Sequence, residues 1–314
     1  MSGRFAPSPT GELHLGNLRT AAIAWLSARA QGIEFLVRME DLDRHQSSVD
    51  HERAQLRDLV AIGIDWDGEV VRQSDRFDRY DDAIRTLEAD GLVYECFCTR
   101  REIRDEIEAA ARAPHGPPGS YPGTCRELTD AARAERRAAG RRPALRLRSD
   151  GRSIEFHDRL VGSVVGLVDD VVLRRNDGVP AYNLAVVVDD GLQGVTEVVR
   201  GDDLLSSTPR QIRLQELLGL ATPSYLHVPL VVDLAGERLA KGRGLPLTLG
   251  ELARDGVGVD SVISWIIESL GEVPLRVHRD QMLTLSEIVG RFDPGQLHRS
   301  PCQIPPFAVE MPPD

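Results

Sequence analysis

The first stretch able to do chemistry is residues 4–17, Arg-Phe-Ala-Pro-Ser-Pro-Thr-Gly-Glu-Leu-His-Leu-Gly-Asn. It predicts a buried strand over Arg4 to Ala6, a tight turn rich in Pro and Gly, and a helix from Leu15. Such a helix start attracts anions, because its first backbone N–H groups and its dipole point at the ligand. We expect His14 to reach a phosphate oxygen there and Gly16 to let a nucleotide lie close to the backbone. On spacing alone, an ordinary capped strand-turn-helix explains the stretch equally well.

The second chemical group is a single lysine. The chain has 38 Lys and Arg residues, and Lys241 is the one lysine among them. A compact, mobile ammonium differs chemically from a planar guanidinium, which indicates that position 241 needs the ammonium. Lys241 lies in a Gly-containing segment after an apolar run, Val228 to Val232, that predicts a strand. The alternative is an ordinary surface loop.

Three of the four cysteines lie close together in the sequence, as Cys96-Phe-Cys98 and Tyr121-Pro-Gly-Thr-Cys125. In a chain expected in the cytoplasm, this spacing favours zinc over disulfides. Zinc usually takes four ligands, and Tyr121, His115 and water are the candidates for the fourth. Three buried thiols without a metal are the alternative, and Cys302 stands alone.

Composition limits the class of protein. A chain of 314 residues predicts about two domains, and the net charge of −11 argues against a generally basic surface for nucleic acid. No stretch approaches the roughly 18–20 apolar residues of a membrane span, and residues 1–30 form no secretory signal, so we expect a cytoplasmic protein. A local RNA-binding face remains open, with an ordinary solvated helix flank as the alternative. Its candidate residues are Arg133, Arg136, Arg137, Arg141 and Arg142.

The elements that position these groups alternate between strands and helices. A strand over 33–39 ends at Glu40-Asp41-Leu42-Asp43, and acidic groups at that end of a strand line the ligand crevice of doubly wound sheets. Helices are predicted over 48–61 and 76–89, with a strand over 92–97. This order predicts an α/β fold with a doubly wound parallel sheet and right-handed crossovers.

Residues 96–178 interrupt that order with a Pro- and Gly-rich loop and predict an inserted lobe with strands over 144–148, 153–156 and 171–175. After it come a continuous apolar run at 182–188, which predicts a buried strand, another strand over 196–200 and a helix from Ser207 to Leu218. From Gly250 the pattern is helical, and 301–314 is Pro-rich and expected to be loose. The predicted domains are a catalytic first half (1–95), a zinc-bearing lobe (96–178), a catalytic second half (179–240), and a loop with a helical appendix and tail (241–314).

These motifs resemble a known family. Residues 4–11 followed by His14-Leu-Gly-Asn17 resemble the first signature of the class I aminoacyl-tRNA synthetases, in its glutamyl branch. That signature usually ends in a second His, and Asn17 can donate hydrogen bonds but cannot carry its charge. Arg238-Leu-Ala-Lys241-Gly resembles the second signature, Lys-Met-Ser-Lys-Ser, with the second Lys retained and Arg238 in place of the first.

The resemblance implies a Rossmann-like catalytic domain and a set of site residues. Lys241 would stabilise charge on the phosphates as pyrophosphate leaves, with His14 as the second catalytic residue. ATP would be bound by His14, Gly16, Asn17, Arg238 and Lys241. Glutamate would be bound by Arg4, Phe5, Ala6, Pro7, Ser8, Glu40, Tyr182 and Arg200, since a dicarboxylate needs guanidinium partners and its ammonium needs a carboxylate. Short glutamyl-type synthetases also use a Cys/Cys/Tyr/Cys set, which implies a structural zinc on Cys96, Cys98, Tyr121 and Cys125.

The implied reaction is ATP-dependent activation of L-glutamate to glutamyl-adenylate, with Mg²⁺ neutralising the phosphates. Residues 242–314 are too few for the anticodon-binding region of full glutamyl-tRNA synthetases. The chain therefore resembles the short glutamyl-Q tRNA(Asp) synthetases, which attach glutamate to the queuosine base of tRNA(Asp), and we expect a monomer. The alternatives are a truncated synthetase that charges tRNA(Glu), another nucleotidyltransferase, and a non-catalytic zinc module that binds RNA.

Overall fold

The structure is a computed structural model that describes residues 1–99, 101–105, 121–237, 239, 248–271 and 283–308. Arg238, Lys241 and His115 therefore lie outside the described residues, and so does most of the segment that resembles the second signature. Among the described residues, no helix has the length and apolar character that a membrane crossing requires.

The core of the molecule is a seven-stranded sheet in the order β3-β2-β1-β9-β10-β6-β7. Neighbouring strands are parallel from β3 to β6, and β7 pairs antiparallel with β6. The predicted doubly wound parallel sheet is thereby confirmed. The strands are β1 Ser2–Phe5, β2 Glu34–Met39, β3 Val71–Arg72, β6 Ser153–Asp158, β7 Gly162–Leu167, β9 Val195–Gly201 and β10 Ser224–Val228.

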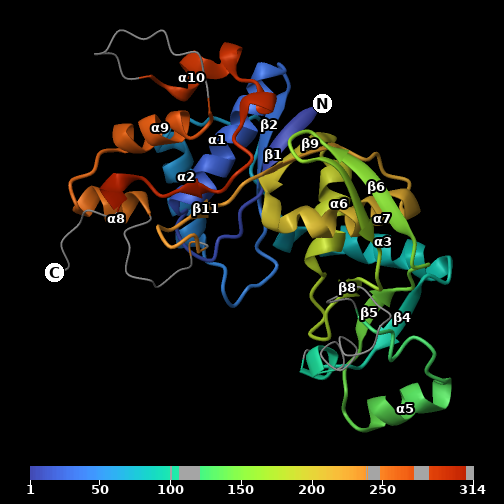
Figure 1. Cartoon of the computed structure of the whole chain (residues 1–314). Helices are drawn as coiled ribbons and strands as arrows, with labels where there is room; N and C mark the ends of the chain where they lie inside the picture. The colour runs from blue at the N-terminus through green and yellow to red at the C-terminus, as the bar shows by residue number, and fades with distance from the viewer. Residues whose placement is uncertain (100, 106–120, 238, 240–247, 272–282, 309–314) are drawn as a thin grey trace.

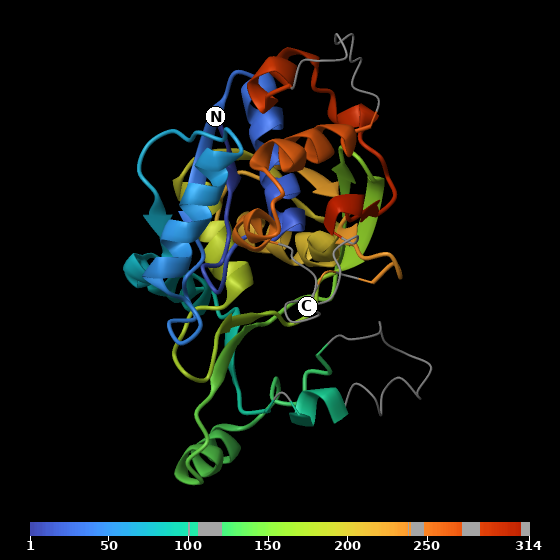
Figure 2. The same ribbon diagram turned by 90° about the vertical axis from the view of Figure 1, so that its left-hand side faces the viewer.

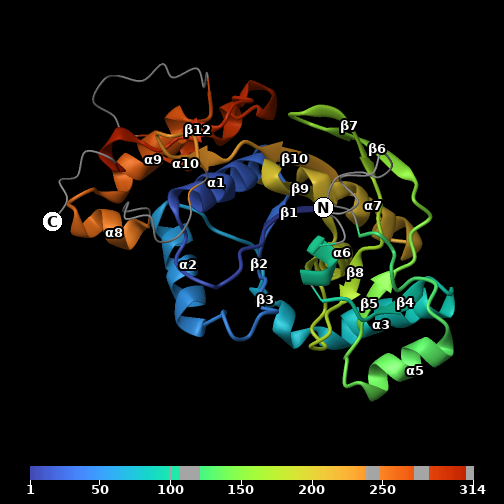
Figure 3. The same ribbon diagram turned by 60° about the horizontal axis from the view of Figure 1, so that its bottom comes forward.

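Helices cover both sides of this sheet, with α1 and α2 on one side and α3, α6 and α7 on the other (Figure 3). The C-terminal helices α8, α9 and α10 gather around α1, so that α1 is buried along most of its length (Figure 1). Burial on all sides explains why α1 is apolar or small at nearly every position. The helices are α1 Leu15–Ala30, α2 Val49–Ala61, α3 Phe77–Ala89, α6 Tyr182–Leu192, α7 Thr208–Leu217, α8 Leu249–Arg254, α9 Val259–Glu268 and α10 Leu285–Ile288.

A lobe projects from this body, as Figures 1 and 2 show. It holds a three-stranded antiparallel sheet, β4-β5-β8, and the exposed helix α5, Asp130–Ala138. Its strands are β4 Val93–Cys96, β5 Ala144–Leu147 and β8 Val172–Arg174.

Two of the predicted strands form, but each belongs to a different sheet from the one expected. The strand over 92–97 is β4, which pairs antiparallel with β5 in the lobe instead of continuing the parallel sheet. Its alternating pattern, with Tyr94 and Cys96 buried and Val93 and Glu95 half-buried, is typical of a sheet with one exposed face. Conversely, the strand over 153–156 is β6, which joins the main sheet beside β10.

Two further expectations are wrong. The apolar run over 182–188 is the helix α6, because a fully buried helix and a fully buried strand give the same apolar pattern. The segment 301–308 is packed: β12, Cys302–Gln303, pairs with β11, Val231–Val232, and Ile304 and Ala308 are buried. The domain boundaries at 95, 178 and 240 stay a prediction.

Candidate active site

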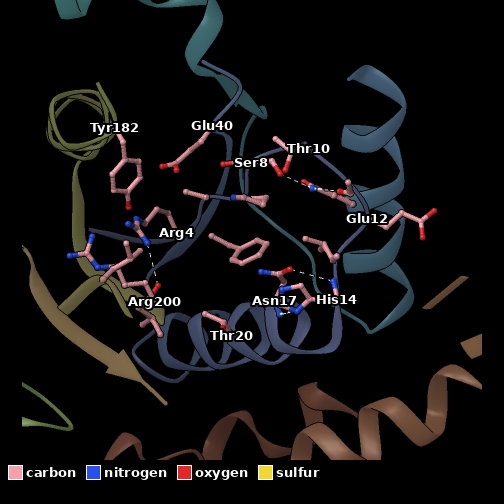
Figure 4. Close-up of a pocket in the computed structure, with 18 residues that line it drawn as sticks. Arg4, Ser8, Thr10, Glu12, His14, Asn17, Thr20, Glu40, Tyr182 and Arg200 are labelled. Atoms are coloured by element: carbon pink, nitrogen blue, oxygen red, sulfur yellow. Dashed lines mark hydrogen bonds between the residues drawn. The ribbon is translucent and has the colours of Figure 1, made fainter. Parts of the chain in front are cut away.

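A cavity of about 440 Å³ opens where the strands β1, β2 and β9 end (Figure 4). It lies at the carboxyl edge of a parallel sheet, where doubly wound folds bind ligands. All the residues predicted to bind glutamate line it, together with His14 and Asn17. The structure thus brings together Arg4, Phe5, Ala6, Pro7, Ser8, Glu40, Tyr182 and Arg200.

His14 caps the start of α1 with its ring. The backbone N–H groups of Gly16 and Asn17 donate to His14 Nδ1 at 3.1 and 3.3 Å, and the His14 N–H donates to Asn17 Oδ1 at 3.3 Å. These N–H groups therefore donate to the imidazole. This corrects the expectation that they are unpaired and available to bind an anion. Because Nδ1 accepts, the neutral ring carries its proton on Nε2.

Gly16 makes this cap possible. A Cβ at position 16 would lie 3.0 Å from His14 Cε1 and 3.1 Å from His14 Nδ1, tighter than ordinary contacts. Gly16 is absent from the lining of the cavity and contributes by leaving space for the imidazole. The Asn17 side chain completes the reciprocal cap.

Helix α2 fixes the turn that precedes α1. Gln55 Nε2 donates to the carbonyl oxygens of Ser8 and Gly11 at 3.0 and 2.7 Å, and the N–H of Ser48 donates to Pro9 O at 3.0 Å. Gln55 itself is buried and lines the cavity. Sequence reasoning missed this residue, since a lone Gln on a helix carries no recognisable signal.

An ion network behind the cavity orients two arginines. Asp190 on α6 accepts from Arg4 Nε at 3.3 Å and from Arg38 Nη1 at 2.8 Å, and Arg38 also reaches Glu40 at 3.5 Å. Burial acts to raise the pKa of Asp190, but the charges of Arg4 and Arg38 outweigh it and hold that pKa below its usual value. Burial raises the pKa of Glu40, with Arg38 and Arg4 opposing the rise.

Arg200 differs from Arg4 in its partners. Its guanidinium donates to three neutral acceptors: His227 Nε2 at 3.0 Å, Gln211 Oε1 at 2.7 Å and Thr208 Oγ1 at 2.9 Å. Within the described ranges Arg200 forms no ion pair. Burial, with Glu40 adding to it, raises the pKa of Tyr182 nearby, so the phenol keeps its proton. The cavity thus presents a positive charge with which no carboxylate of the described residues forms an ion pair.

A second cavity of about 770 Å³ adjoins the first. The two share Ser8, Glu40 and Tyr182 as walls, and the second extends to Cys98 and Arg146 in the lobe. A molecule seated there would lie between the candidate amino-acid site and the lobe.

The predicted metal ligands meet at the base of the lobe. The sulfur atoms of Cys96, Cys98 and Cys125 lie within 4.8 Å of one another. The Tyr121 hydroxyl lies 3.3 Å from Cys96 Sγ and accepts from the Cys125 N–H at 3.0 Å. Arg146 stacks on the Tyr121 ring, with Cζ 3.8 Å from the centroid, and supplies a positive charge beside the thiols. Three thiols around a common point suit zinc, for which cysteine sulfur is a usual ligand.

Comparison with known proteins identifies the family. Residues 1–267 match the model of the tRNA synthetases class I (E and Q), catalytic domain. The chain therefore belongs to this family, and the predicted fold class and the predicted ligase type of enzyme are confirmed.

Comparison with individual proteins shows which members of this family the chain is similar to. The chain is 57% identical over 300 residues to a protein of Nocardia farcinica named glutamyl-Q tRNA(Asp) synthetase, covering 96% of this chain and 92% of that one. It is 53% identical over 272 residues to the protein of that name from Cutibacterium acnes, covering 86% and 76%. The crystal structure of glutamate-tRNA synthetase from Elizabethkingia anophelis matches with a TM-score of 0.78 and 25% identity, covering 98% of this chain and 68% of that one. The resemblance expected from the motifs is confirmed.

Proposed function

We propose that this protein activates L-glutamate with ATP and transfers it to the queuosine base of tRNA(Asp). The main support for this proposal is one cavity, beside His14, that is lined by Arg4, Glu40, Tyr182 and Arg200. The identity to relatives named glutamyl-Q tRNA(Asp) synthetase supports the choice of acceptor. The partners ATP and tRNA support a cytoplasmic location, and we propose that the monomer is active.

Glutamate recognition follows from the charges in the cavity. Arg200, whose partners among the described residues are all neutral, suits one substrate carboxylate, which a charge-assisted hydrogen bond holds by about 1.5–3 kcal/mol. Glu40 suits the substrate ammonium, whose charge would favour the ionised form of this buried carboxyl. Arg4, which shares Asp190 with Arg38, and the Tyr182 hydroxyl complete the site.

In the activation step, an oxygen of the substrate α-carboxylate bonds to the α-phosphorus of ATP, and the bond to pyrophosphate breaks. His14 Nε2–H donates to a phosphate oxygen, and the resemblance of residues 238–242 to the second signature implies that Lys241 and Arg238 would contact the phosphates. Bound Mg²⁺ would neutralise part of the phosphate charge. The protein transfers no proton in this step, so positioning and electrostatic stabilisation supply the rate enhancement.

For transfer, we propose that the acceptor nucleoside enters the second cavity, which shares walls with the first. Arg137, which is exposed, and the half-buried Arg133 and Arg136 on α5 are candidates to contact the tRNA backbone. Cys96, Cys98, Tyr121 and Cys125 would hold one structural zinc that stiffens the base of the lobe.

The test is incubation with labelled glutamate, ATP and one tRNA at a time, followed by mild-alkali release. We expect label on tRNA(Asp) that carries queuosine and none on tRNA(Asp) that lacks it. Label on tRNA(Glu) instead would support the alternative, a glutamyl-tRNA synthetase activity, which the likeness to the Elizabethkingia anophelis enzyme favours. Absence of label on every tRNA would contradict both.

A further inference from the structure

The residues behind Arg200 form a buried chain that leads away from the cavity. Arg200 Nε donates to His227 Nε2 at 3.0 Å, and His227 Nδ1 lies 2.7 Å from Asp158 Oδ2. Asp158 and His227 are fully buried, and Arg200 is 5% exposed. The three residues come from the adjacent strands β9, β10 and β6. Neither His227 nor Asp158 lines the cavity.

We propose that His227 is a positioning residue for glutamate binding, because it orients the guanidinium of Arg200. Asp158 fixes the His227 tautomer that can accept from Arg200. This inference rests on the proposed function, since it assumes that Arg200 binds a carboxylate of glutamate.

The hydrogen bonds define one tautomer. Arginine has no acceptor, so His227 Nε2 must accept from Arg200, and Nδ1 must then carry the proton and donate to Asp158. Asp158 is held in turn by the N–H groups of His227, Leu160 and Val161, at 2.9–3.0 Å. Burial, and then the charge of Arg200, lower the pKa of His227 despite the Asp158 carboxylate, which keeps the ring neutral.

The neutral ring separates two opposite charges. A carboxylate in direct contact with Arg200 would oppose the charge of the guanidinium, as Asp190 does at Arg4. The imidazole instead holds Arg200 through a neutral acceptor and keeps Asp158 one side chain away. Arg200 therefore keeps both a fixed direction and its full charge for the substrate.

The aromatic packing around His227 maintains this arrangement. The Tyr225 ring stacks on His227 with centroids 5.9 Å apart and an interplanar angle of 13°. Phe156 meets His227 edge-on at 6.5 Å. The ring is therefore fixed in its plane, and a phenyl ring of similar shape fits the same space without the Nε2 acceptor.

The test compares KM for glutamate with KM for ATP in glutamate-dependent ATP–pyrophosphate exchange. His227→Phe removes the acceptor, and we expect KM for glutamate to rise about 10–100-fold, the cost of a hydrogen bond to a charged group, with KM for ATP within about twofold. His227→Gln restores an acceptor oxygen near the position of Nε2 and should recover most of the loss. Asp158→Asn places an amide N–H opposite His227 Nδ1, so that Nδ1 must accept and Nε2 must carry the proton. Nε2 can then no longer accept from Arg200. We therefore expect this variant to raise KM for glutamate as His227→Phe does.

The matched control is Asp170→Asn. Asp170 is another buried carboxylate, in the lobe, where it accepts from Tyr94 and the Ser149 N–H, and the change should leave KM for glutamate as it is. An unchanged KM for glutamate in His227→Phe would overturn the inference. So would an equal rise in both KM values, or a fall in kcat and melting temperature alone, because these indicate a structural role.

The proposed function can fail separately. If the wild-type chain shows no exchange with glutamate, calorimetry of L-glutamate binding replaces the kinetic readout. Weaker binding in His227→Phe then supports the inference although the proposed function has failed. Equal binding, or no binding by the wild-type chain, overturns it.

Discussion

At the scale of single residues, His14 combines an observed helix cap with the phosphate contact that we propose. Its Nδ1 accepts from the first N–H groups of α1, and its Nε2 carries the proton of the neutral ring at a cavity wall. A residue that caps the helix without an imidazole would therefore keep the fold and lose the donor. Asparagine is such a residue, since it is among the best N-caps.

His14→Asn and His14→Ala separate these functions. We expect both variants to lose about 10²–10³-fold in kcat for pyrophosphate exchange, the cost of one transition-state donor. We expect His14→Ala alone to lose about 1 kcal/mol of unfolding free energy, because it removes the cap. Urea denaturation and exchange kinetics measure the two effects. Full activity in His14→Asn would show that the imidazole has no role beyond the cap.

Sequence reasoning found some residues of the site and missed others for a physical reason. Arg4, Glu40, Tyr182 and Arg200 lie in motifs whose resemblance to the family names them, and they do line one cavity. The partners that hold them could not be found in this way. Asp158 and His227 are single buried polar residues 69 positions apart, and periodicity says nothing about which buried polar groups meet.

At the scale of elements, α2 supports the turn through Gln55 and through Asp58, which accepts from the backbone of Leu13. Burial, and then the charge of Glu12, raise the pKa of Asp58 to about 6. An unfolded Asp titrates near about 4, so the folded chain binds this proton more tightly. The stabilising contribution of the protonated form is therefore full below about pH 4 and is lost as the pH rises through about 6.

Asp58→Asn should remove this pH dependence. An amide oxygen can still accept from Leu13, and the variant carries no charge beside Glu12. We expect its melting temperature to exceed that of the wild type by about 1–3 °C at pH 7.5, a modest figure because Asp58 is half-buried, and by less at pH 5. Thermal melts at the two pH values measure this. A gain that is equal at both pH values would contradict the account.

A second prediction at this scale concerns the cluster of Cys96, Cys98 and Cys125 in the lobe. Cys98→Ser should abolish stoichiometric zinc in the purified protein, since it removes one of three thiols around a common point. Cys302→Ser is the matched control, because Cys302 lies on β12, outside that cluster. Metal analysis of both variants decides the matter. Unchanged zinc in Cys98→Ser would remove the proposed site.

The elements also show where pattern reasoning fails. Strands and helices of the parallel sheet were predictable, because turns and caps separate them and their apolar periods differ. The helix α6 was not, since burial on every side removes its amphipathic period. Sheet membership of β4 and β6 depends on contacts across the lobe junction, which no local pattern encodes.

At the scale of the whole molecule, segments from the first and the last parts of the chain meet near the start of α1. β11, paired with β12, lies against the start of α1, where Val231 is 3.5 Å from the position of a Cβ on Gly16. Thr248, just before α8, pairs with His14 in an isolated bridge. The Pro-rich composition of residues 301–314 predicted a loose tail because it does not reveal these long-range contacts.

Removal of residues 301–314 tests this part of the fold. It exposes Val231, Val232 and α1, and deletes the buried Ile304, so we expect a loss of about 2–4 kcal/mol in unfolding free energy. Removal of 309–314 keeps every described contact of β12 and should cost much less. Urea denaturation compares the two truncations. Equal stability of both would show that β12 contributes nothing.

ATP–pyrophosphate exchange without tRNA is the direct test of glutamate activation by this protein. We predict exchange that depends on L-glutamate, is absent with L-glutamine, and falls at least about a hundredfold in Lys241→Ala. No exchange with glutamate, or equal exchange with glutamine, would contradict the account.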